Sequence, residues 1–384
     1  MDVSLFFELE TSDLSETGVK RTFDQCVEQV MLADRLGYRA VWFTEHHFLP
    51  GFSYSSSPEL VLAHLAARTQ NIRLGHGIVL LPFRINHPLR VAERIATLDL
   101  LSNGRVEFGG GRAISESELS GFEVNPDDTR PQWEESLRVL PKIWTQESFQ
   151  YESGTLKIPE RQVVPKPVQK PHPPMWVAAT QPATLEFAGD HGIGVLGFGI
   201  GQGQSNEYVR LYRDRIKKCD PIGAFVNDKF ALLTFTLCCD TDEEALAIQG
   251  PNFRMYNEAV RNLFAPWIDG KPPRSYEFFM KHWVENMYLT QSVPISEIVK
   301  SGGACIGSPE TCLNVLQFLA DAGVDEALLF MQMYTTPHDK IMRSIQLIAD
   351  KVMPKLKNSR QTSESSGSFS GKAAIPINTQ PPRK

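Results

Sequence analysis

The sequence Trp42-Phe43-Thr44-Glu45-His46-His47-Phe48 passes from an apolar strand pattern into ionisable residues. The strand pattern begins at Ala40, and Pro58 opens a helical pattern after the loop that follows. Such strand-helix units repeat about eight times along the chain, which favours a (β/α)8 TIM barrel with insertions over an open doubly wound sheet. Active sites of these barrels form at the carboxyl ends of the strands, where Glu45, His46 and His47 would lie.

The repeats occupy most of the chain. Residues 149–174 interrupt them with prolines, so we expect an irregular surface excursion there, and residues 265–303 give no clear assignment. We expect one barrel domain over residues 1–357 and a disordered tail over residues 358–384, which have little to bury. The expected strands are residues 3–9, 40–43, 72–81, 105–111, 175–179, 195–198, 230–239 and 326–331, and the expected helices are residues 22–36, 58–66, 88–101, 132–144, 185–190, 208–217, 242–264, 309–322 and 339–352.

The composition excludes several classes of protein. The 384 residues are 42% hydrophobic, enough for a large core, and 39 basic against 45 acidic residues leave no basic footprint for nucleic acid. The chain has no run of 18 apolar residues and no secretion signal at its start, so we expect no membrane span. Six cysteines without Cys-x-x-Cys spacing indicate reduced thiols, hence a soluble, cytoplasmic protein.

The histidines of the opening stretch suit proton transfer, because imidazole titrates near neutral pH. Loop histidines without a role, or metal ligands, are the alternatives, but no His-Glu-x-x-His spacing supports a metal site, and we expect none. Aromatic residues gather in the loops after the same expected strands. The expected substrate pocket comprises His47, Phe48, Phe52, Tyr54 and Phe83.

A second strand ending, Val106 to Arg112, contains three glycines followed by an arginine. Glycines let a backbone approach a ligand closely, and the guanidinium of Arg112 is a forked donor for an anion such as phosphate. A tight turn with a solvated arginine is the alternative. The glycines between Gly197 and Gly203 lack the Gly-x-Gly-x-x-Gly spacing of a dinucleotide site, so we expect a loop at the barrel mouth.

Several motifs, taken in order, resemble those of the bacterial-luciferase-like flavin monooxygenases across about residues 1–357. The likeness rests on their order and spacing, which are more specific than any one motif. The motifs are residues 42–48 (WFTEHHF), 98–105 (LDLLSNGR), 108–112 (FGGGR), 165–169 (PKPVQ), 173–180 (PPMWVAAT) and 352–356 (VMPKL).

This resemblance implies a barrel that binds reduced FMN at its carboxyl face and, with O2, inserts one oxygen atom into a small organic substrate. Hydroxylation and Baeyer-Villiger insertion both remain open, and natural-product biosynthesis is one setting for such an enzyme. The resemblance also implies a separate flavin reductase that supplies the reduced FMN, and a homodimer. Carried over by position, His46 matches the catalytic histidine, and the cofactor-binding positions are Gly77 and Ile78, which form a cis peptide under the flavin ring, Arg112 and Ile114 in the phosphate loop, and Ala179, Thr180, Gln181 and Thr184 in a second phosphate-binding turn.

Some positions depart from the resemblance. Gly111 stands where the light-emitting enzymes have a reactive cysteine, and Thr180 stands where they have an acid, so light emission is not expected. A deazaflavin-dependent dehydrogenase on the same barrel, which transfers hydride without oxygen, is the main alternative, although Glu45 to Phe48 favour FMN. A non-enzymatic flavin-binding protein is a further alternative. The sequence does not identify the substrate.

Overall fold

The computed structural model describes residues 1–198, 202–268, 270–281 and 292–357. Within them, eight parallel strands form a closed barrel, because β11 pairs with β1 in the register Leu329 to Leu5. The expected (β/α)8 barrel is confirmed. The barrel strands, in order, are β1 (Asp2–Phe7), β2 (Ala40–Phe43), β3 (Arg73–Leu80), β4 (Val106–Gly111), β7 (Met175–Ala179), β8 (Gly194–Phe198), β9 (Phe230–Cys238) and β11 (Glu326–Phe330).

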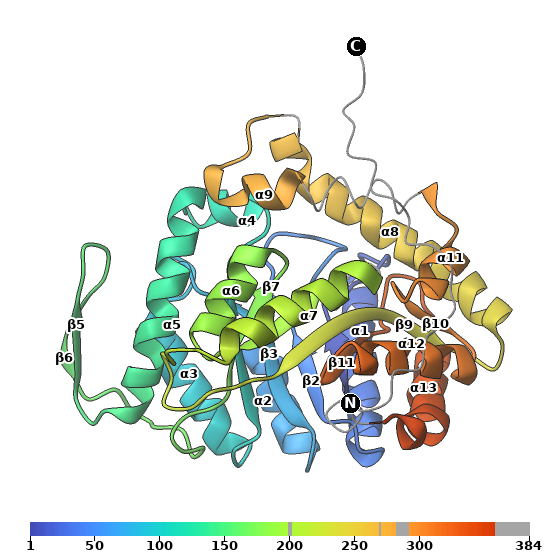
Figure 1. The fold of residues 1–384 in the computed structure, drawn as a ribbon, viewed down its shortest axis with the longest axis horizontal. Helices are drawn as coiled ribbons and strands as arrows, with labels where there is room; N and C mark the ends of the chain where they lie inside the picture. Colours follow the sequence, from blue (N-terminus) through green and yellow to red (C-terminus); the bar gives the residue numbers. More distant parts are fainter. Residues whose placement is uncertain (199–201, 269, 282–291, 358–384) are drawn as a thin grey trace.

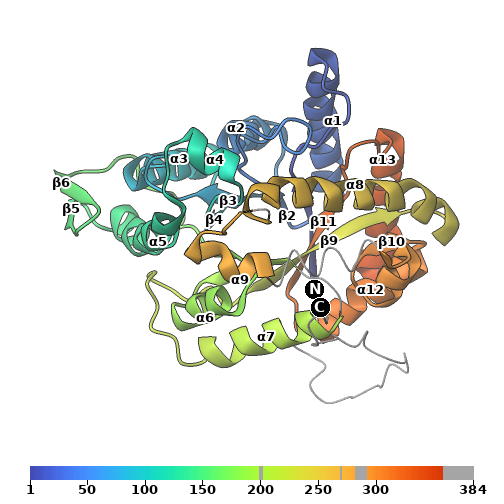
Figure 2. The ribbon, with the colours of Figure 1, turned by 90° about the horizontal axis from the view of Figure 1, so that it is seen from above.

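Helices surround the barrel, as Figure 2 shows from above. In Figure 1, α8 crosses one end of the barrel near α4 and α9, while the chain begins at the opposite end. Because β1 starts there, α8 covers the carboxyl ends of the strands. The helices are α1 (Glu16–Arg35), α2 (Pro58–Arg68), α3 (Pro88–Leu101), α4 (Glu116–Gly121), α5 (Thr129–Thr145), α6 (Pro182–Asp190), α7 (Gln202–Ile216), α8 (Asp242–Ile268), α9 (Glu277–Phe279), α11 (Ile295–Lys300), α12 (Pro309–Asp321) and α13 (His338–Leu347).

The structure corrects the expected irregular excursion at residues 149–174. Strands β5 (Phe149–Glu152) and β6 (Lys157–Arg161) form an antiparallel hairpin that projects from the barrel (Figure 1). Pro159 is tolerated in β6 because it lies at the register irregularity opposite β5, where the ladder of hydrogen bonds is interrupted.

Some elements were not expected from the sequence. Helix α4 follows β4, α9 and α11 lie in the stretch without an assignment, and the short strand β10 (Cys305–Gly307) pairs with β9 outside the barrel. The expected helix over residues 339–352 is α13 followed by a π-helical segment, Ile348–Val352. The expected tail, residues 358–384, and residues 199–201 of the expected mouth loop lie outside the described residues.

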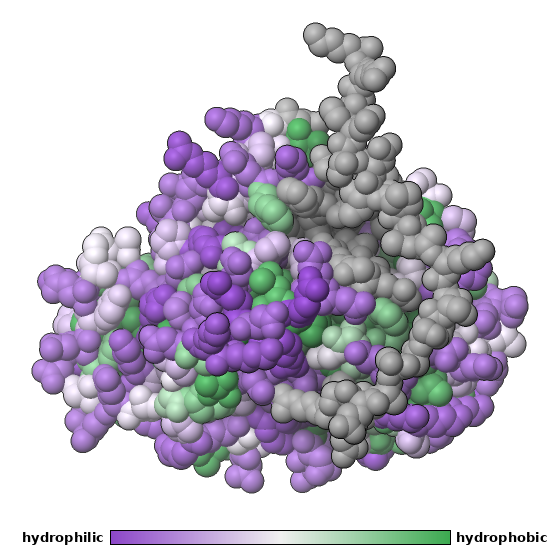
Figure 3. Space-filling model, in the orientation of Figure 1, coloured by the Kyte–Doolittle hydropathy of each residue, from purple (hydrophilic) through white to green (hydrophobic). Residues whose placement is uncertain are grey.

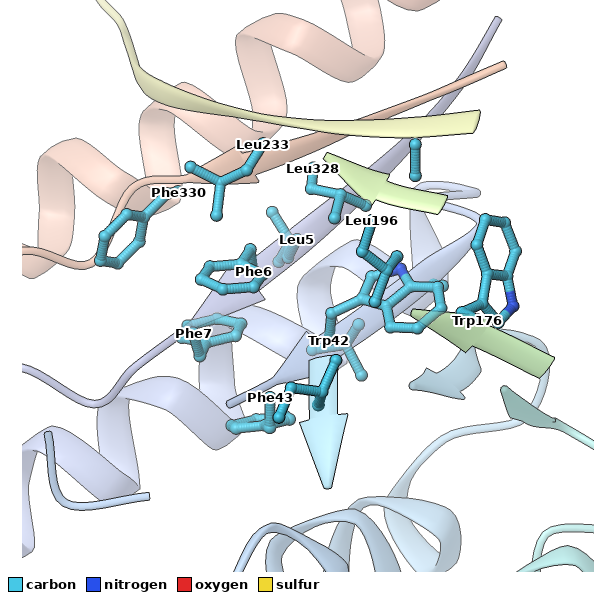
Figure 4. Packing of buried hydrophobic residues seen from close by; sticks show 14 of the residues in the cluster. Leu5, Phe6, Phe7, Trp42, Phe43, Trp176, Leu196, Leu233, Leu328 and Phe330 are labelled. Carbon is cyan, nitrogen blue, oxygen red and sulfur yellow. The ribbon is translucent and has the colours of Figure 1, made fainter. Parts of the chain in front are cut away.

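Two tryptophans fill the barrel interior. The rings of Trp42 and Trp176, whose strands lie on opposite sides of β3 and β4, meet edge to face with centroids 5.3 Å apart (Figure 4). Gly75 is required beside them, because a Cβ there would lie 2.3 Å from the Trp42 ring. Each indole N–H has an acceptor, Glu326 for Trp42 at 2.9 Å and Glu107 for Trp176 at 2.6 Å, as buried indoles require.

Two arginines compensate these buried carboxylates: Arg39 pairs with both of them, and Arg73 pairs with Glu107 at 2.5 Å. Arg39 donates to Glu107 at 2.6 Å and to Glu326 at 2.8 Å, while both carboxylate side chains are 2% exposed or less. Burial raises the pKa of Glu326, although the charge of Arg39 and hydrogen bonds from Ser4 and Trp42 oppose the rise. The network joins the amino-terminal ends of β11 and β4, and we call this end of the barrel interior its floor.

The outer surface carries mostly polar side chains. The face seen in Figure 3 is mostly hydrophilic, with small, separate hydrophobic patches. Among the residues described, no helix combines the length and the apolar character needed to cross a membrane, and no group of His, Cys, Asp and Glu is arranged to hold a metal ion.

We predict that Arg39→Ala lowers the free energy of unfolding by about 3–5 kcal/mol, because it leaves the buried carboxylate of Glu326 without its cation, while Glu107 retains Arg73. Urea denaturation measures this. Arg21→Ala is the control, since its ion pair with Asp13 is half exposed, and it should cost less than about 1 kcal/mol. A loss for Arg39→Ala as small as that of the control would contradict the role of the network.

Candidate functional site

A cavity opens at the carboxyl end of the barrel, beneath α8. It encloses about 1260 Å³, part of it continuous with solvent, and its walls are mainly apolar. Polar groups occur on two sides. On the β1–β2 side these are Glu8, Thr44, Glu45, His46 and Tyr256 of α8, and on the β4–β7 side they are Arg112, Thr180, Gln181 and Thr184.

His46 lies just beyond the end of β2 and is 8% exposed. Its Nδ1 donates to Glu118 Oε1 at 3.0 Å. Burial opposes protonation of the ring, but the charge of Glu118 and this hydrogen bond prevail, with Glu8 and Glu45 adding to them, so the pKa of His46 is raised. With Nδ1 engaged, Nε2 is the nitrogen that can exchange a proton within the cavity.

Glu118 owes its position to helix capping. Ser115 and Glu118 form a capping box at the start of α4, in which the Ser115 N–H donates to Glu118 Oε2 at 3.1 Å and the Glu118 N–H donates to Ser115 Oγ. The other carboxylate oxygen, Oε1, accepts from His46 and from the backbone N–H of His47. Although burial opposes ionisation, the charge of His46 and these hydrogen bonds hold the pKa of Glu118 below its usual value.

Glu45 ties the end of β2 to the end of β3. Its Oε2 accepts the Leu80 N–H at 2.8 Å, and its Oε1 accepts Asn86 Nδ2 at 2.8 Å and His47 Nε2 at 3.1 Å. Both carboxylate oxygens are therefore engaged. Because Glu45 immediately precedes His46, this bracing limits the movement of the imidazole.

Arg112 lies just beyond the end of β4 and has only neutral partners in the described part of the chain. Its guanidinium donates to Thr129 Oγ1 at 3.3 Å and to the Ser275 carbonyl at 3.4 and 3.5 Å, and it lies 4.8 Å from the centre of the Tyr276 ring. Burial lowers the pKa of Arg112. A partly buried cation with long, neutral hydrogen bonds favours an anionic ligand.

The start of α6 lies on the same side of the cavity. Gln181 is the N-cap residue, and its side chain makes no capping hydrogen bond; its Nε2 donates to Thr184 Oγ1 at 3.4 Å instead. The first backbone N–H groups of a helix and its dipole favour negative charge. Together with Arg112, this helix end gives the cavity one side suited to a phosphate group.

The peptide bond between Gly77 and Ile78 is cis, as the sequence resemblance implied, and both residues line the cavity. The glycines of β4 serve this wall. A Cβ at Gly111 would lie 2.6 Å from Ile78, and one at Gly109 would lie 2.2 Å from the His76 carbonyl. These two glycines therefore make room for β3 and its continuation, whereas the sequence suggested room for a ligand.

The structure brings together His46, Gly77, Ile78, Arg112, Ile114, Thr180, Gln181 and Thr184 around one cavity. Ala179 is fully buried in β7 and does not line it. The five residues expected to form the substrate pocket, His47, Phe48, Phe52, Tyr54 and Phe83, are also absent from its walls.

Phe48 shows why this aromatic group lies elsewhere. Its backbone is left-handed, with φ at 61°, its ring packs on Gly121 and near Phe122, and it is 56% exposed. His47 turns toward Glu45, and Phe52 lies behind His46 with ring centroids 5.7 Å apart. The wall opposite comes instead from α8, through Tyr256, Val260 and Phe264.

Several cavity or supporting residues were missed in the sequence, among them Glu118, Glu8, Tyr256 and Tyr276. Glu118 was detectable from the Ser-x-x-Glu pattern at residues 115–118, and Glu8 from the carboxylates that follow β1, as Glu45 follows β2. Tyr256 and Tyr276 come from segments whose contacts depend on long-range packing, and no local signal marks them.

The chain is thus an α/β barrel whose cavity has a cationic side at Arg112 and a buried imidazole at His46. Residues 1–326 match the family model of luciferase-like monooxygenases, and the chain belongs to that family. The oxygenase component of the flavin-dependent trigonelline monooxygenase of Acinetobacter baylyi is 30% identical over 281 residues, 70% of this chain and 76% of that protein.

Two solved structures share the fold. The oxygenating constituent of 3,6-diketocamphane monooxygenase from Pseudomonas putida, a type II Baeyer-Villiger monooxygenase in complex with FMN, has a TM-score of 0.72 and 21% identity. An F420-dependent secondary alcohol dehydrogenase has a TM-score of 0.70 and 15% identity. Each comparison covers 93% of this chain and 99% of the other. The same barrel thus occurs with two different cofactors.

We predict that Glu118→Gln lowers the pKa of His46, because it removes the charge that favours the imidazolium. A titration of histidine labelled with carbon-13 measures the shift. In the wild type, the ion pair stabilises the fold between the lowered pKa of Glu118 and the raised pKa of His46, and this stability is lost as pH rises through the latter. Glu116→Gln, an exposed change on the same helix, should leave the His46 titration unaltered; equal behaviour of the two variants would contradict the assignment.

Proposed function

We propose that this protein is an FMN-dependent monooxygenase that inserts one atom of O2 into a small organic substrate. When bound, reduced FMN supplies the electrons that activate O2. The observation that carries the proposal is Arg112, a partly buried cation without a described anionic partner, in the cavity of a luciferase-like monooxygenase barrel. The flavin-dependent relative and the FMN-bound structural neighbour support this choice of cofactor.

Different residues of the cavity would bind the phosphate, support the flavin ring and transfer a proton. Arg112, Thr184 and the first turn of α6 would hold the phosphate, and the wall at Gly77 and Ile78 would support the flavin ring. His46, whose protonated form is stabilised by Glu118, would hold or move a proton at Nε2. Apolar walls and α8 would exclude water from the reaction.

A deazaflavin-dependent dehydrogenase is the second candidate, supported by the F420-dependent neighbour. A deazaflavin cofactor also carries phosphate, so Arg112 does not separate the two. The monooxygenase relative of higher sequence identity, and the family that matches residues 1–326, favour oxygen transfer. Trigonelline and diketocamphane, named for the two relatives, differ so much chemically that neither is assigned as the substrate.

We propose two protein partners. A separate flavin reductase would supply reduced FMN, as the oxygenase component and the oxygenating constituent among the relatives suggest for those enzymes. A second copy of the chain would cover the exposed leucines of α2 and α3, where Leu60 is 68% exposed and Leu101 is 65% exposed. We propose a cytoplasmic location on the basis of the composition.

We predict that Arg112→Ala weakens the binding of reduced FMN by roughly 10- to 150-fold, the loss of a charge-assisted contact worth about 1.5–3 kcal/mol. Anaerobic fluorescence titration measures this. Riboflavin, which lacks the phosphate, should bind both proteins almost equally. Arg90→Ala, which breaks an exposed ion pair on α3, is the control. Equal weakening of both flavins would mean that Arg112 supports the fold or the ring.

We predict that His46→Ala lowers turnover to oxygenated product by roughly 100- to 10,000-fold, the usual effect of losing a general acid or base, while FMN still binds. His47→Ala is the matched control, because His47 lies next in the chain but outside the cavity wall. Its effect should be less than about tenfold. Turnover of His46→Ala within a factor of about three of the wild type would exclude the proton-transfer role.

A further inference from the structure

The β1 end of the cavity contains buried acceptors without donors. Glu8 is 5% exposed and lines the cavity; its Oε1 receives one long hydrogen bond, from the Tyr256 hydroxyl at 3.4 Å, and its Oε2 has no partner among the described residues. Two residues further along, Glu10 is 2% exposed, and neither of its carboxylate oxygens makes a hydrogen bond of good geometry to the described part of the chain, although Tyr334 lies close enough to oppose the rise of its pKa. Such groups are costly to bury unless something pairs with them.

Thr44 provides an independent observation at the same place. It follows β2, is 5% exposed and lines the cavity, and its Oγ1 also has no hydrogen-bond partner within the described ranges. A neighbouring strand thus presents a second unpartnered polar atom to the space that Glu8 faces. Because a hydroxyl can accept as well as donate, Thr44 and Glu8 can receive N–H groups of the same ligand.

The charges around Glu8 do not balance. The charged and titratable groups that act on it are His46, Tyr256, Glu118, Glu10 and Tyr334. His46 is the only cation among them, and it is already hydrogen-bonded to Glu118. Burial raises the pKa of Glu8 to about 7 and that of Glu10 well above its usual value, which reflects two carboxyl groups that lack a cation.

Buried carboxylates at the floor of the same barrel are, in contrast, paired with cations. There Arg39 bridges Glu107 and Glu326, and Arg73, Ser4 and the two indoles donate the remaining hydrogen bonds to these carboxylates. No arginine or lysine of the described chain forms an ion pair with Glu8 or Glu10. Glu8 lines the cavity without such a partner, whereas the carboxylates of the floor are paired within the protein.

We propose that Glu8, with Thr44 and the charge of Glu10, binds a positively charged nitrogen of the substrate, so that the substrate class is organic amines and cationic nitrogen heterocycles. This inference rests on the proposed function, since it identifies the substrate of the same cavity. The aromatic ring of Tyr256 adds a face that attracts cations, and the apolar walls at Phe6, Leu196 and Leu328 suit the organic part of the molecule.

Isothermal titration of the full chain with benzylamine and benzyl alcohol tests the proposal, because the two probes have similar size and differ in charge. We expect benzylamine to bind at least tenfold more tightly. The cation favours ionised carboxylates, so protons should be released on binding near pH 7, which is measured by repeating the titration in buffers of different ionisation enthalpy. Equal binding of the two probes, or binding of benzylamine without proton release, would overturn the proposal.

Variants locate the binding group. Glu8→Gln keeps the shape of the side chain and should reduce the preference for benzylamine at least tenfold, and Thr44→Val should reduce it less. Glu123→Gln, whose carboxylate is exposed and paired with Arg84, is the control and should retain the full preference. An unchanged preference in Glu8→Gln would contradict the site.

Parallel FMN titrations separate this inference from the proposed function. Binding of FMN without any preference for benzylamine would overturn the substrate class alone, since the flavin site would stand. Binding of benzylamine without FMN would support the amine site and overturn the cofactor. If Glu8→Gln fails to fold, the comparison of the two probes and the measurement of proton release still decide the proposal. Both of these use the wild-type protein.

Discussion

Inside the barrel, the guanidinium of Arg39 bridges the carboxylates of Glu107 and Glu326, which come from β4 and β11. Carboxylates in an environment of low polarity need a nearby cation and a complete set of hydrogen bonds, and without them one partner of the network would carry an uncompensated charge. The floor therefore has a fixed arrangement. Trp42 and Trp176, which donate to the same carboxylates, separate it from the cavity at the carboxyl end.

The need of a buried charge for an opposite charge also applies to the two polar sides of the cavity. Arg112 is a cation without a described anion on the β4 side, and Glu8 and Glu10 are carboxyl groups without a cation on the β1 side. The pair of His46 and Glu118 lies near Glu8 and is already balanced. In the account proposed, an anionic cofactor and a cationic substrate group complete the charges that the protein itself leaves incomplete.

The sequence predicted the barrel because its strands are apolar runs with clear helical repeats between them. His46 and Arg112 were predictable for the same reason, since each follows such a run and matches a family motif. The aromatic residues expected around Phe48 do not line this cavity, and the left-handed backbone at Phe48 directs its ring toward Gly121. The left-handed backbone at Phe48 could not be predicted from the local sequence pattern.

Other parts of the site depend on contacts between distant segments. Glu118 is visible locally as a helix cap, but its bond to His46 requires α4 to lie against the end of β2. Tyr256 reaches Glu8 across 248 residues of sequence, and Tyr276 reaches the Ala113 carbonyl across 163. Such approaches follow from closure of the barrel and from the path of α8, which single-sequence patterns do not specify.

The central claim is that this cavity supports oxygen transfer. The most direct test supplies the chain with FMN, a flavin reductase and a panel of organic amines under oxygen-18 gas, and examines the products by mass spectrometry. The account predicts a product that carries one oxygen-18 atom from the gas and none when the label is in water. A product that has only lost hydrogen, or whose new oxygen comes from water, would contradict it.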